Sequence, residues 1–266
     1  MATTDDEEDF IPPHVTTVNA NEAAAVVTGH SRGIGEAVAE HLLARGTRVL
    51  GVSRHTNARL GGRFPDMLEE VVLDVADEAA LRRWLGHQPL ERFFANAETP
   101  LLVNNAGVLQ PIGPLETQEI EKVAEAVTVN LSAPLVLSAA FVQVTADARE
   151  RRVLHVSSGA ARKAYAGWSI YCATKAGLDH HARCVALDRT PGLLISSVAP
   201  GVVDTEMQAE IRASTDERFP DRPRFIALHR DKALPTADRT GGRLVEYLLS
   251  EVFGADPVFE LKDFNG

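Results

Sequence analysis

The chain has 266 residues, of which 45% are hydrophobic, and carries a formal net charge of −10, with an isoelectric point near 5.4. This length and composition allow a substantial core and suit one large α/β domain. The acidic balance disfavours nucleic acid and anionic membrane surfaces as partners, and no run of 18 apolar residues predicts a membrane span. A small molecule or a protein is therefore the expected partner.

The N-terminal residues and the two cysteines bear on cellular location. Residues 1–22 begin MATTDDEEDF and have no apolar segment like that of a secretory signal. We expect them to form a mobile acidic tail before a domain over 23–266. Cys172 and Cys184 lie twelve residues apart, unlike a Cys-x-x-Cys motif, and are too few for a disulfide framework. We expect both to be packing residues in a cytoplasmic protein.

From residue 23 onward, short β-rich segments alternate with amphipathic segments. The β-rich segments are apolar without polar alternation, which is typical of parallel strands covered by helices on both faces. Pro134 should bend the longest helix, because proline lacks a backbone donor and crowds the preceding turn. We expect strands at 23–28, 47–53, 69–73, 100–103, 151–156, 193–198 and near 257–260, and helices at 33–46, 77–87, 117–148, 169–189 and 236–250. The expected fold class is a single α/β domain with a parallel sheet.

The first expected turn, TGHSRGIG (28–35), connects a strand to a helix. Gly29 permits a tight turn, Gly33 lets the backbone approach a ligand, and Gly35 lets the helix pack near the strand. The N-terminus of the helix offers free N–H groups to a pyrophosphate. The turn therefore predicts a dinucleotide site; the alternative is a glycine turn that only connects the two elements.

The second strand ends in Ser53 and Arg54, where a cofactor with a free ribose 2′-hydroxyl would require an acidic residue. Arg54, together with Arg32 of the glycine turn, can hold a 2′-phosphate by charge-assisted hydrogen bonds. This favours NADPH over NADH. The alternative is that both arginines are solvated surface residues.

The segment GWSIYCATK (167–175) places Tyr171 four residues before Lys175. In a helix the two side chains share a face. Tyrosine can act as a proton donor in catalysis, although its ordinary pKa is about 10. An adjacent ammonium should lower that pKa by favouring phenolate. The alternative is two polar residues on the solvated side of a helix.

Residues 204–235 form a long, charged insertion with three prolines and two short helical patches. It follows the APG turn at 199–201, where ligands gather at the carboxyl ends of parallel strands. It is either a lid over a site or a surface loop, and we favour the lid.

The neighbouring Asp179, His180 and His181 invite a metal-site interpretation. Adjacent histidines point to different helix faces, and no third ligand shares their spacing. We expect no metal, and surface or interface positions for these residues.

Seven ordered motifs together resemble the short-chain dehydrogenase/reductase family over residues 23 to about 260. They are TGHSRGIG (28–35), LDV (73–75), NNAG (104–107), VNLSAP around Asn130, SSG (157–159), Tyr-x-x-x-Lys (171–175) and PGVVDT (200–205). The run SSGAARKAYAGWSIYCATKAGLD, with APGVVDTEMQ, looks like the sepiapterin reductase and benzil reductase branch. The resemblance implies a Rossmann-type doubly wound sheet, an NAD(P) cofactor and carbonyl/alcohol redox chemistry.

The resemblance also implies roles for single residues. Tyr171 would be the acid/base and Lys175 its partner, Ser158 would contact the substrate oxygen, and Asn130 would hold a water in a proton relay. The adenine would lie beside Asp74 and Val75, and Thr205 would meet the nicotinamide carboxamide. The full set expected to bind NADP(H) adds Tyr171 and Lys175 to Gly29, Ser31, Arg32, Gly33, Ile34, Gly35, Ser53, Arg54, Asp74, Val75, Asn104, Ala106, Gly107, Pro200, Gly201, Val203 and Thr205.

Aromatic and apolar residues near the expected site suggest the substrate. A pocket formed by Ser158, Tyr165, Trp168 and Met207, with Phe225 in the insertion, would accept a planar or aryl ketone. The alternative is ordinary core packing. The family resemblance further implies a homodimer or homotetramer, assembled through the helices at 117–148 and 169–189.

Three functions are candidates. The first is an NADPH-dependent carbonyl reductase of a ketone, diketone or pteridine side-chain ketone; for a pterin, Asp263 is the candidate anchor. The second is an NADP-binding sensor or scaffold without turnover, which would not need the set Asn130, Ser158, Tyr171 and Lys175. The third, a sugar-nucleotide epimerase, would ordinarily show G-x-x-G-x-x-G and a longer C-terminal domain, and the chain has neither.

Overall fold

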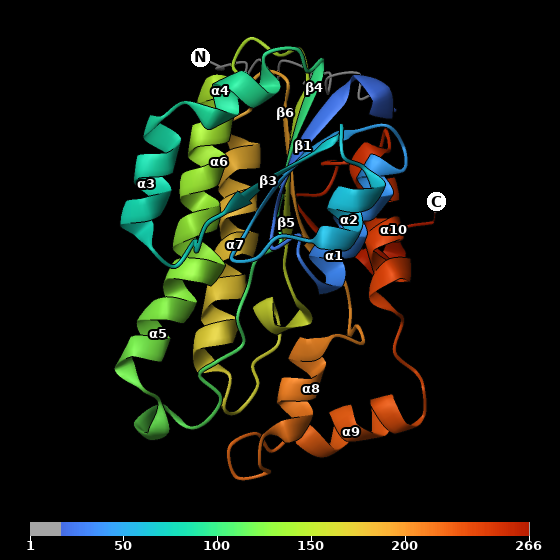
Figure 1. Ribbon diagram of the computed structural model, residues 1–266. Helices are drawn as coiled ribbons and strands as arrows, with labels where there is room; N and C mark the ends of the chain where they lie inside the picture. Colours follow the sequence, from blue (N-terminus) through green and yellow to red (C-terminus); the bar gives the residue numbers. More distant parts are fainter. Residues whose placement is uncertain (1–16, 266) are drawn as a thin grey trace, which may run out of the picture.

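The computed structural model describes residues 17–265 and forms a three-layer α/β domain around a seven-stranded sheet (Figure 1). All neighbouring strands pair in parallel. The strands are β1 (Ala23–Thr28), β2 (Arg48–Ser53), β3 (Leu68–Val72), β4 (Thr99–Asn104), β5 (Arg151–Val156), β6 (Leu193–Ala199) and β7 (Val258–Glu260), in the order β3-β2-β1-β4-β5-β6-β7. The order reverses between β1 and β4, and ligands of such sheets bind outside the carboxyl ends at this switch point. The expected Rossmann-type fold is confirmed.

Helices cover both faces of the sheet (Figure 1). On one face α1 packs against α10, and on the other α6 and α7 lie along the strands. Each interface buries its own apolar cluster. The helices are α1 (Gly33–Leu43), α2 (Ala58–Arg63), α3 (Glu78–Gly86), α4 (Pro89–Phe94), α5 (Ile120–Val127), α6 (Ala133–Val144), α7 (Ser169–Leu187), α8 (Glu206–Ala213), α9 (Arg222–Arg230) and α10 (Ala237–Leu249).

The helix expected at 117–148 is divided by a π-helical turn, η3 (Thr128–Ser132), between α5 and α6. Pro134 follows in the first turn of α6, where the missing N–H of proline is tolerated. The predicted irregularity therefore lies just before Pro134. Such turns are often functional, and this one carries the buried Asn130.

Among the described residues one helix, Ile120–Val144, is long and apolar enough to cross a membrane by length and composition. Its residues Leu137 and Phe141 are buried in the cluster that packs on the sheet. This apolarity is that of a helix covering a sheet, and Ile120, Val127 and Val136 remain exposed on its outer side.

Residues 17–22, predicted to belong to a mobile tail, are packed onto the domain. Val18 is buried and its N–H donates to the Leu249 carbonyl over 2.9 Å. The short 3-10 helix Ala20–Glu22 follows, capped by the side chain of Asn19. The tail prediction is therefore wrong for these residues, while its part over 1–16 lies outside the described residues.

The insertion (204–235) forms two helices, α8 and α9, beyond the carboxyl ends of the strands (Figure 1). Phe219 and Phe225 of this segment are buried. Arg222 ties the segment together by donating to the Arg212 carbonyl at 2.9 Å and to Asp216 at 2.9 Å. The insertion is therefore a packed structure that covers the end of the sheet where the site lies.

Candidate active site

The glycine loop forms an open cradle at the end of β1. Gly29 and Gly33 have positive φ angles of 70° and 60°, which favour glycine. A Cβ at Gly35 would lie 2.2 Å from the Gly29 carbonyl oxygen, whereas a Cβ at Gly33 would find only Thr205 Cγ2, at 3.8 Å. The space before the N-terminus of α1 is thus kept free of side chains, and a pyrophosphate fits it.

A second loop, after β4, is tied to the end of β1. The N–H groups of Asn105 and Ala106 both donate to Thr28 Oγ1 at 3.0 Å, and Asn105 Nδ2 donates to the Thr28 carbonyl at 3.0 Å. Asn104, predicted to contact the cofactor, is buried, and its amide donates to Ser138 Oγ at 3.1 Å. The sequence prediction missed Asn105, although the doubled asparagine of NNAG contains it.

Where the adenosine of a dinucleotide would lie, the arginines predicted for a 2′-phosphate are exposed. Arg54 is exposed at the end of β2, while Arg32 forms an ion pair with Glu206 of α8. The ion pair of Arg32 with a carboxylate of α8 was not predicted from the sequence. Ser53 Oγ donates to the His55 carbonyl at 2.5 Å, and Asp74 caps its own loop by accepting from the Ala76 N–H at 2.9 Å.

A buried contact beneath this region was not predicted from the sequence. His30, fully buried inside the glycine loop, pairs through Nε2 with Glu70 Oε1 at 2.7 Å. The same oxygen accepts from the Asn57 N–H at 2.6 Å, and Asn57 Nδ2 donates to the Ser31 carbonyl at 3.2 Å. These contacts connect β3 with the two loops that would hold the adenosine phosphate, and no local pattern links residues so far apart.

The four predicted catalytic residues come from three elements that meet at the carboxyl end of β5. Tyr171 and Lys175 lie one turn apart on α7, and both are buried. Ser158 follows β5 as the cap of the 3-10 helix Gly159–Ala161, and its side chain acts to lower the pKa of the Tyr171 phenol. Asn130 reaches the same place from the π turn, because a Cβ on Gly107 would meet both Asn130 Oδ1 (3.4 Å) and Lys175 Nζ (3.6 Å).

The electrostatics of Tyr171 differ from the prediction. Burial raises its pKa to about 12, and the Ser158 side chain acts in the opposite direction. Lys175 does not lower this pKa: its Nζ lies 5.8 Å from the centre of the Tyr171 ring and donates to the Val156 carbonyl at 2.8 Å. Desolvation is the largest influence on this pKa, so the phenol stays protonated.

Lys175 is itself perturbed. Burial lowers the pKa of its ammonium to about 8, and the negative charge of Asp179 opposes that shift. The pKa of this side chain therefore lies close to physiological pH, where it can both give up and take up a proton.

Asn130 has a structural task that the sequence prediction did not include. Its Oδ1 accepts from the Val108 N–H at 2.8 Å, and its Nδ2 donates to the Val108 carbonyl at 2.8 Å and to Thr174 Oγ1 at 3.3 Å. The side chain thus fixes the loop after β4 against α7. Its predicted role in a water relay stays a prediction.

Of the residues predicted to form a substrate pocket, some pack in the protein interior and others face the catalytic residues. Trp168 is buried and stacks on Phe219 with ring centres 4.3 Å apart, so it packs the insertion onto the domain. Tyr165 is partly buried beside it, at 5.2 Å between ring centres. Met207 of α8 places its Sδ 4.0 Å from the Tyr171 hydroxyl. Met207 therefore faces the phenol, whereas Trp168 and the buried Phe225 follow the packing alternative.

Other expectations for α7 need correction. Asp179 is buried rather than on the surface. His181 contacts the buried His155, with 3.1 Å between His181 Nδ1 and His155 Nε2. Cys184 is exposed, so its predicted packing role is wrong, while Cys172 is partly buried in the aromatic cluster. Within residues 17–265 no group of three or more His, Cys, Asp or Glu side chains is arranged to hold a metal ion.

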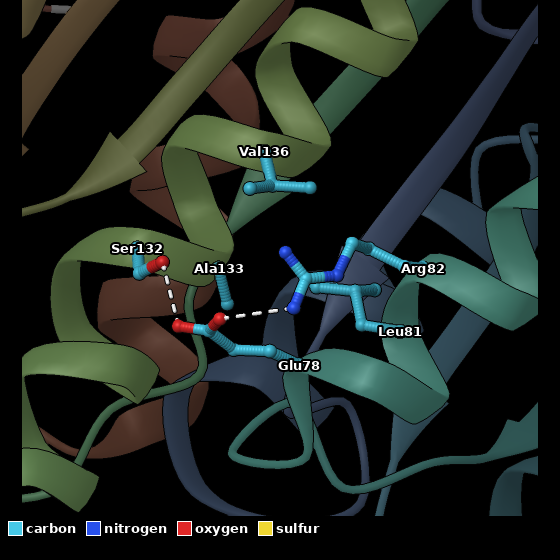
Figure 2. Close-up of a pocket in the computed structure, with 6 residues that line it drawn as sticks. All are labelled: Glu78, Leu81, Arg82, Ser132, Ala133 and Val136. Carbon is cyan, nitrogen blue, oxygen red and sulfur yellow. Dashed lines mark hydrogen bonds and ion pairs between the residues drawn. The ribbon is translucent and has the colours of Figure 1, made fainter.

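A shallow pocket between α3 and the start of α6 lies apart from this site (Figure 2). Its polar groups already bind one another, because Ser132 Oγ donates to Glu78 Oε1 at 3.2 Å and Arg82 pairs with Glu78 at 3.4 Å. None of the predicted site residues lines it.

Comparisons with known proteins agree with this geometry. A family model described as short chain dehydrogenase matches residues 23–216. A benzil reductase ((S)-benzoin forming) of Bacillus cereus is 34% identical over 90% of this chain and 98% of its own. A sepiapterin reductase of Mus musculus is 30% identical over 87% and 93% of the two chains. The crystal structure of a short-chain dehydrogenase/reductase from Burkholderia vietnamiensis is 47% identical, with a TM-score of 0.67, over 92% of this chain and 100% of that one.

The glycine loop at the switch point of the sheet, the buried tyrosine and lysine on α7, and these likenesses lead to one assignment. The chain belongs to the short-chain dehydrogenase/reductase family of oxidoreductases, in the branch that resembles benzil and sepiapterin reductases.

Proposed function

We propose that the protein is an NADPH-dependent carbonyl reductase that reduces a ketone or diketone. The observation that carries the proposal is the buried Tyr171 at the strand ends, one helical turn from Lys175 and influenced by the Ser158 side chain, together with the open glycine loop. The names of the benzil and sepiapterin reductases support a carbonyl substrate.

When bound, the nicotinamide cofactor supplies hydride to the carbonyl carbon. The chain then has to stabilise and protonate the oxygen on which negative charge develops. Ser158 donates a hydrogen bond to that oxygen, and Tyr171 delivers the proton. Because burial raises the pKa of Tyr171 to about 12, the phenol is protonated at the start of the reaction.

Lys175 assists the proton transfer. Its pKa of about 8 makes the Lys175 ammonium a suitable donor for restoring the phenol after Tyr171 has lost its proton. Asn130 holds the Val108 loop beside the amine and orders the water that completes the relay.

The preference for NADPH rests on charge. Arg54 is exposed at the end of β2, and Arg32 is exposed at the start of α1, where it pairs with Glu206 on the surface. A 2′-phosphate offers both guanidinium groups a dianion, which competes well with a single exposed carboxylate.

The substrate lies between Ser158, Tyr171 and Met207, under the insertion, which acts as the lid. The sulfur near the phenol and the partly buried Tyr165 give this space an apolar and aromatic lining, which suits an aryl ketone or diketone.

The protein works as a homodimer or homotetramer. Exposed apolar side chains on α5, α6 and α7 support this, because such faces mark association surfaces. They are Ile120, Val127, Val136 and Leu187. The two cysteines, free in the structure, agree with a cytoplasmic location.

The proposal is tested by following NADPH oxidation with a panel of aryl diketones. We expect turnover by the wild-type protein and a loss of about 100-fold or more in kcat for Tyr171→Phe, with unchanged NADPH binding. A protein that binds NADPH, does not turn over any ketone and is indifferent to Tyr171→Phe would instead be a cofactor-binding sensor or scaffold.

A further inference from the structure

A buried carboxylate stands one turn beyond Lys175 on α7, and the mechanism above does not use it. Asp179 is 1% exposed. Its Oδ1 accepts hydrogen bonds from Ser157 Oγ at 2.6 Å and from Ser197 Oγ at 2.8 Å. Burying a carboxylate costs free energy, which only hydrogen bonds and nearby opposite charges can offset.

The two serines belong to neighbouring parts of the sheet, because Ser157 directly follows β5 and β5 pairs with β6. Ser157 directly precedes the catalytic Ser158, and Ser197 lies in β6. Lys175 donates to the carbonyl of Val156, the residue before Ser157, at 2.8 Å. Val156 and Ser157 thus form hydrogen bonds with Lys175 and Asp179 of α7, and the next residue, Ser158, influences the pKa of Tyr171. The spacing between Ser158 and Tyr171 depends on this series of contacts.

The charges around Asp179 are few. Arg162 approaches Oδ2 with its Nε at 3.5 Å but is shared with Glu260 of β7 at 3.3 Å. On the β5 side, burial, His181 and Lys175 lower the pKa of His155 to about 3, so His155 is neutral at physiological pH. Burial also lowers the pKa of His181. Tyr171 is neutral as well, which leaves Lys175 and Arg162 as the cations facing Asp179.

We propose that Asp179 is a positioning residue for carbonyl reduction: it braces the end of β5 against α7 and supplies the negative charge that keeps Lys175 an ammonium. The proposal rests on the proposed reductase function. In agreement with it, Asp179 acts against the effect of burial on the pKa of Lys175. Asp179 does not touch substrate; it acts through Lys175 and Ser157.

The first test measures the ionisation of Lys175 directly, without cofactor or substrate. The chain has only five lysines, so the side-chain NMR signals of labelled lysine can be assigned by Lys175→Arg. In Asp179→Asn we expect the pKa of Lys175 to fall by about one unit or more. Asp188→Asn, an exposed position at the end of the same helix, removes the same charge and should leave it unchanged. An unchanged pKa in Asp179→Asn overturns the charge role.

The second test measures the pH profile of ketone reduction. In Asp179→Asn the alkaline limb should move to lower pH by the same amount as the pKa of Lys175, while Asp179→Glu should restore its position. A uniform loss of kcat at every pH, with the limb in place, would make Asp179 a structural residue only and overturn the proposal. If the wild-type protein reduces no ketone, the proposed function fails, and the NMR titration still decides the effect of Asp179 on Lys175.

The third test separates bracing from charge and serves if Asp179→Asn does not fold. Ser197→Ala removes one donor to Asp179 and keeps its charge. We expect kcat to fall by about three- to tenfold with the alkaline limb unmoved. A wild-type kcat in this variant overturns the bracing role.

Discussion

The glycine loop and the insertion face the same strand ends, but different forces build them. The glycine loop is a backbone structure in which Gly33 keeps space open and hydrogen bonds from Asn105 and Ala106 to Thr28 fix the walls. The insertion is a side-chain structure, held by the stack of Trp168 on Phe219 and by the burial of Phe225. A site built from backbone suits a cofactor that stays the same from one enzyme to another, whereas a site built from side chains can be altered by substitution to fit another substrate. We therefore expect mutations in the two regions to affect different ligands.

The largest effect should follow a change at Gly35. A Cβ there would lie 2.2 Å from the Gly29 carbonyl oxygen, so Gly35→Ala must move the loop that faces the pyrophosphate. We expect NADPH binding, measured by fluorescence titration, to weaken by about 100-fold or more. Gly62→Ala is the matched control, because a Cβ at Gly62 meets nothing within 4 Å. Equal NADPH affinity in the two variants would contradict the role given to the cradle.

A change at Trp168 should affect the other region. Trp168→Ala removes the stack on Phe219 and should destabilise the protein by about 3–5 kcal/mol in denaturant unfolding. In the remaining folded protein we expect KM for the ketone to rise about tenfold, with NADPH affinity retained. Trp84→Ala, in α3, is the control that should leave both ligands unaffected. Loss of NADPH affinity in Trp168→Ala would show that the two regions are not separable.

The pH dependence extends the comparison to α7, which meets the insertion where the Tyr171 hydroxyl lies near Met207. The pKa of Lys175 is about 8, and only the ammonium supports proton delivery, so ketone reduction should fall about tenfold per pH unit above pH 8. Stability should respond in the opposite sense. A lysine whose folded pKa lies below the ordinary 10.5 leaves more protons on the unfolded chain between pH 8 and 10, so this group favours folding as pH rises. A flat rate up to pH 9.5 would contradict the account.

The smallest effect is expected at Arg54, which is exposed and whose interactions are therefore screened by solvent. Arg54→Ala should raise KM for NADPH by about two- to fivefold and leave KM for NADH unchanged, measured by initial rates with each cofactor. Arg63→Ala, an exposed arginine at the end of α2, is the control. If NADH serves as well as NADPH in the wild type, the cofactor preference is wrong.

Features set by local sequence could be predicted, whereas contacts between distant residues could not. The strands and the glycine loop are predictable because apolar runs and glycine spacing report local conformation, and Tyr171 and Lys175 share a face because one helix carries both. The short α2, with two adjacent glycines, has no comparable signal, since glycine disfavours helix. The pairs His30–Glu70 and Trp168–Phe219 join residues 40 and 51 positions apart, and no local pattern reports them.

The pKa of Tyr171 was predicted in the wrong direction for a related reason. Sequence places a lysine nearby, which favours phenolate, but it does not report how deeply the phenol is buried or that the amine donates to Val156. Desolvation is a property of the assembled fold, and here it dominates. Asp179 was likewise expected at the surface, because only the fold reveals that Ser157 and Ser197 surround it.

The most direct test of the central claim is a single turnover with NADPH that carries deuterium at the transferable position of its ring, using an aryl diketone as substrate. The account predicts deuterium on the carbinol carbon of the product in the wild-type protein, and at least a 100-fold slower transfer in Tyr171→Phe. Product without deuterium, or equal transfer rates in the two proteins, would contradict it.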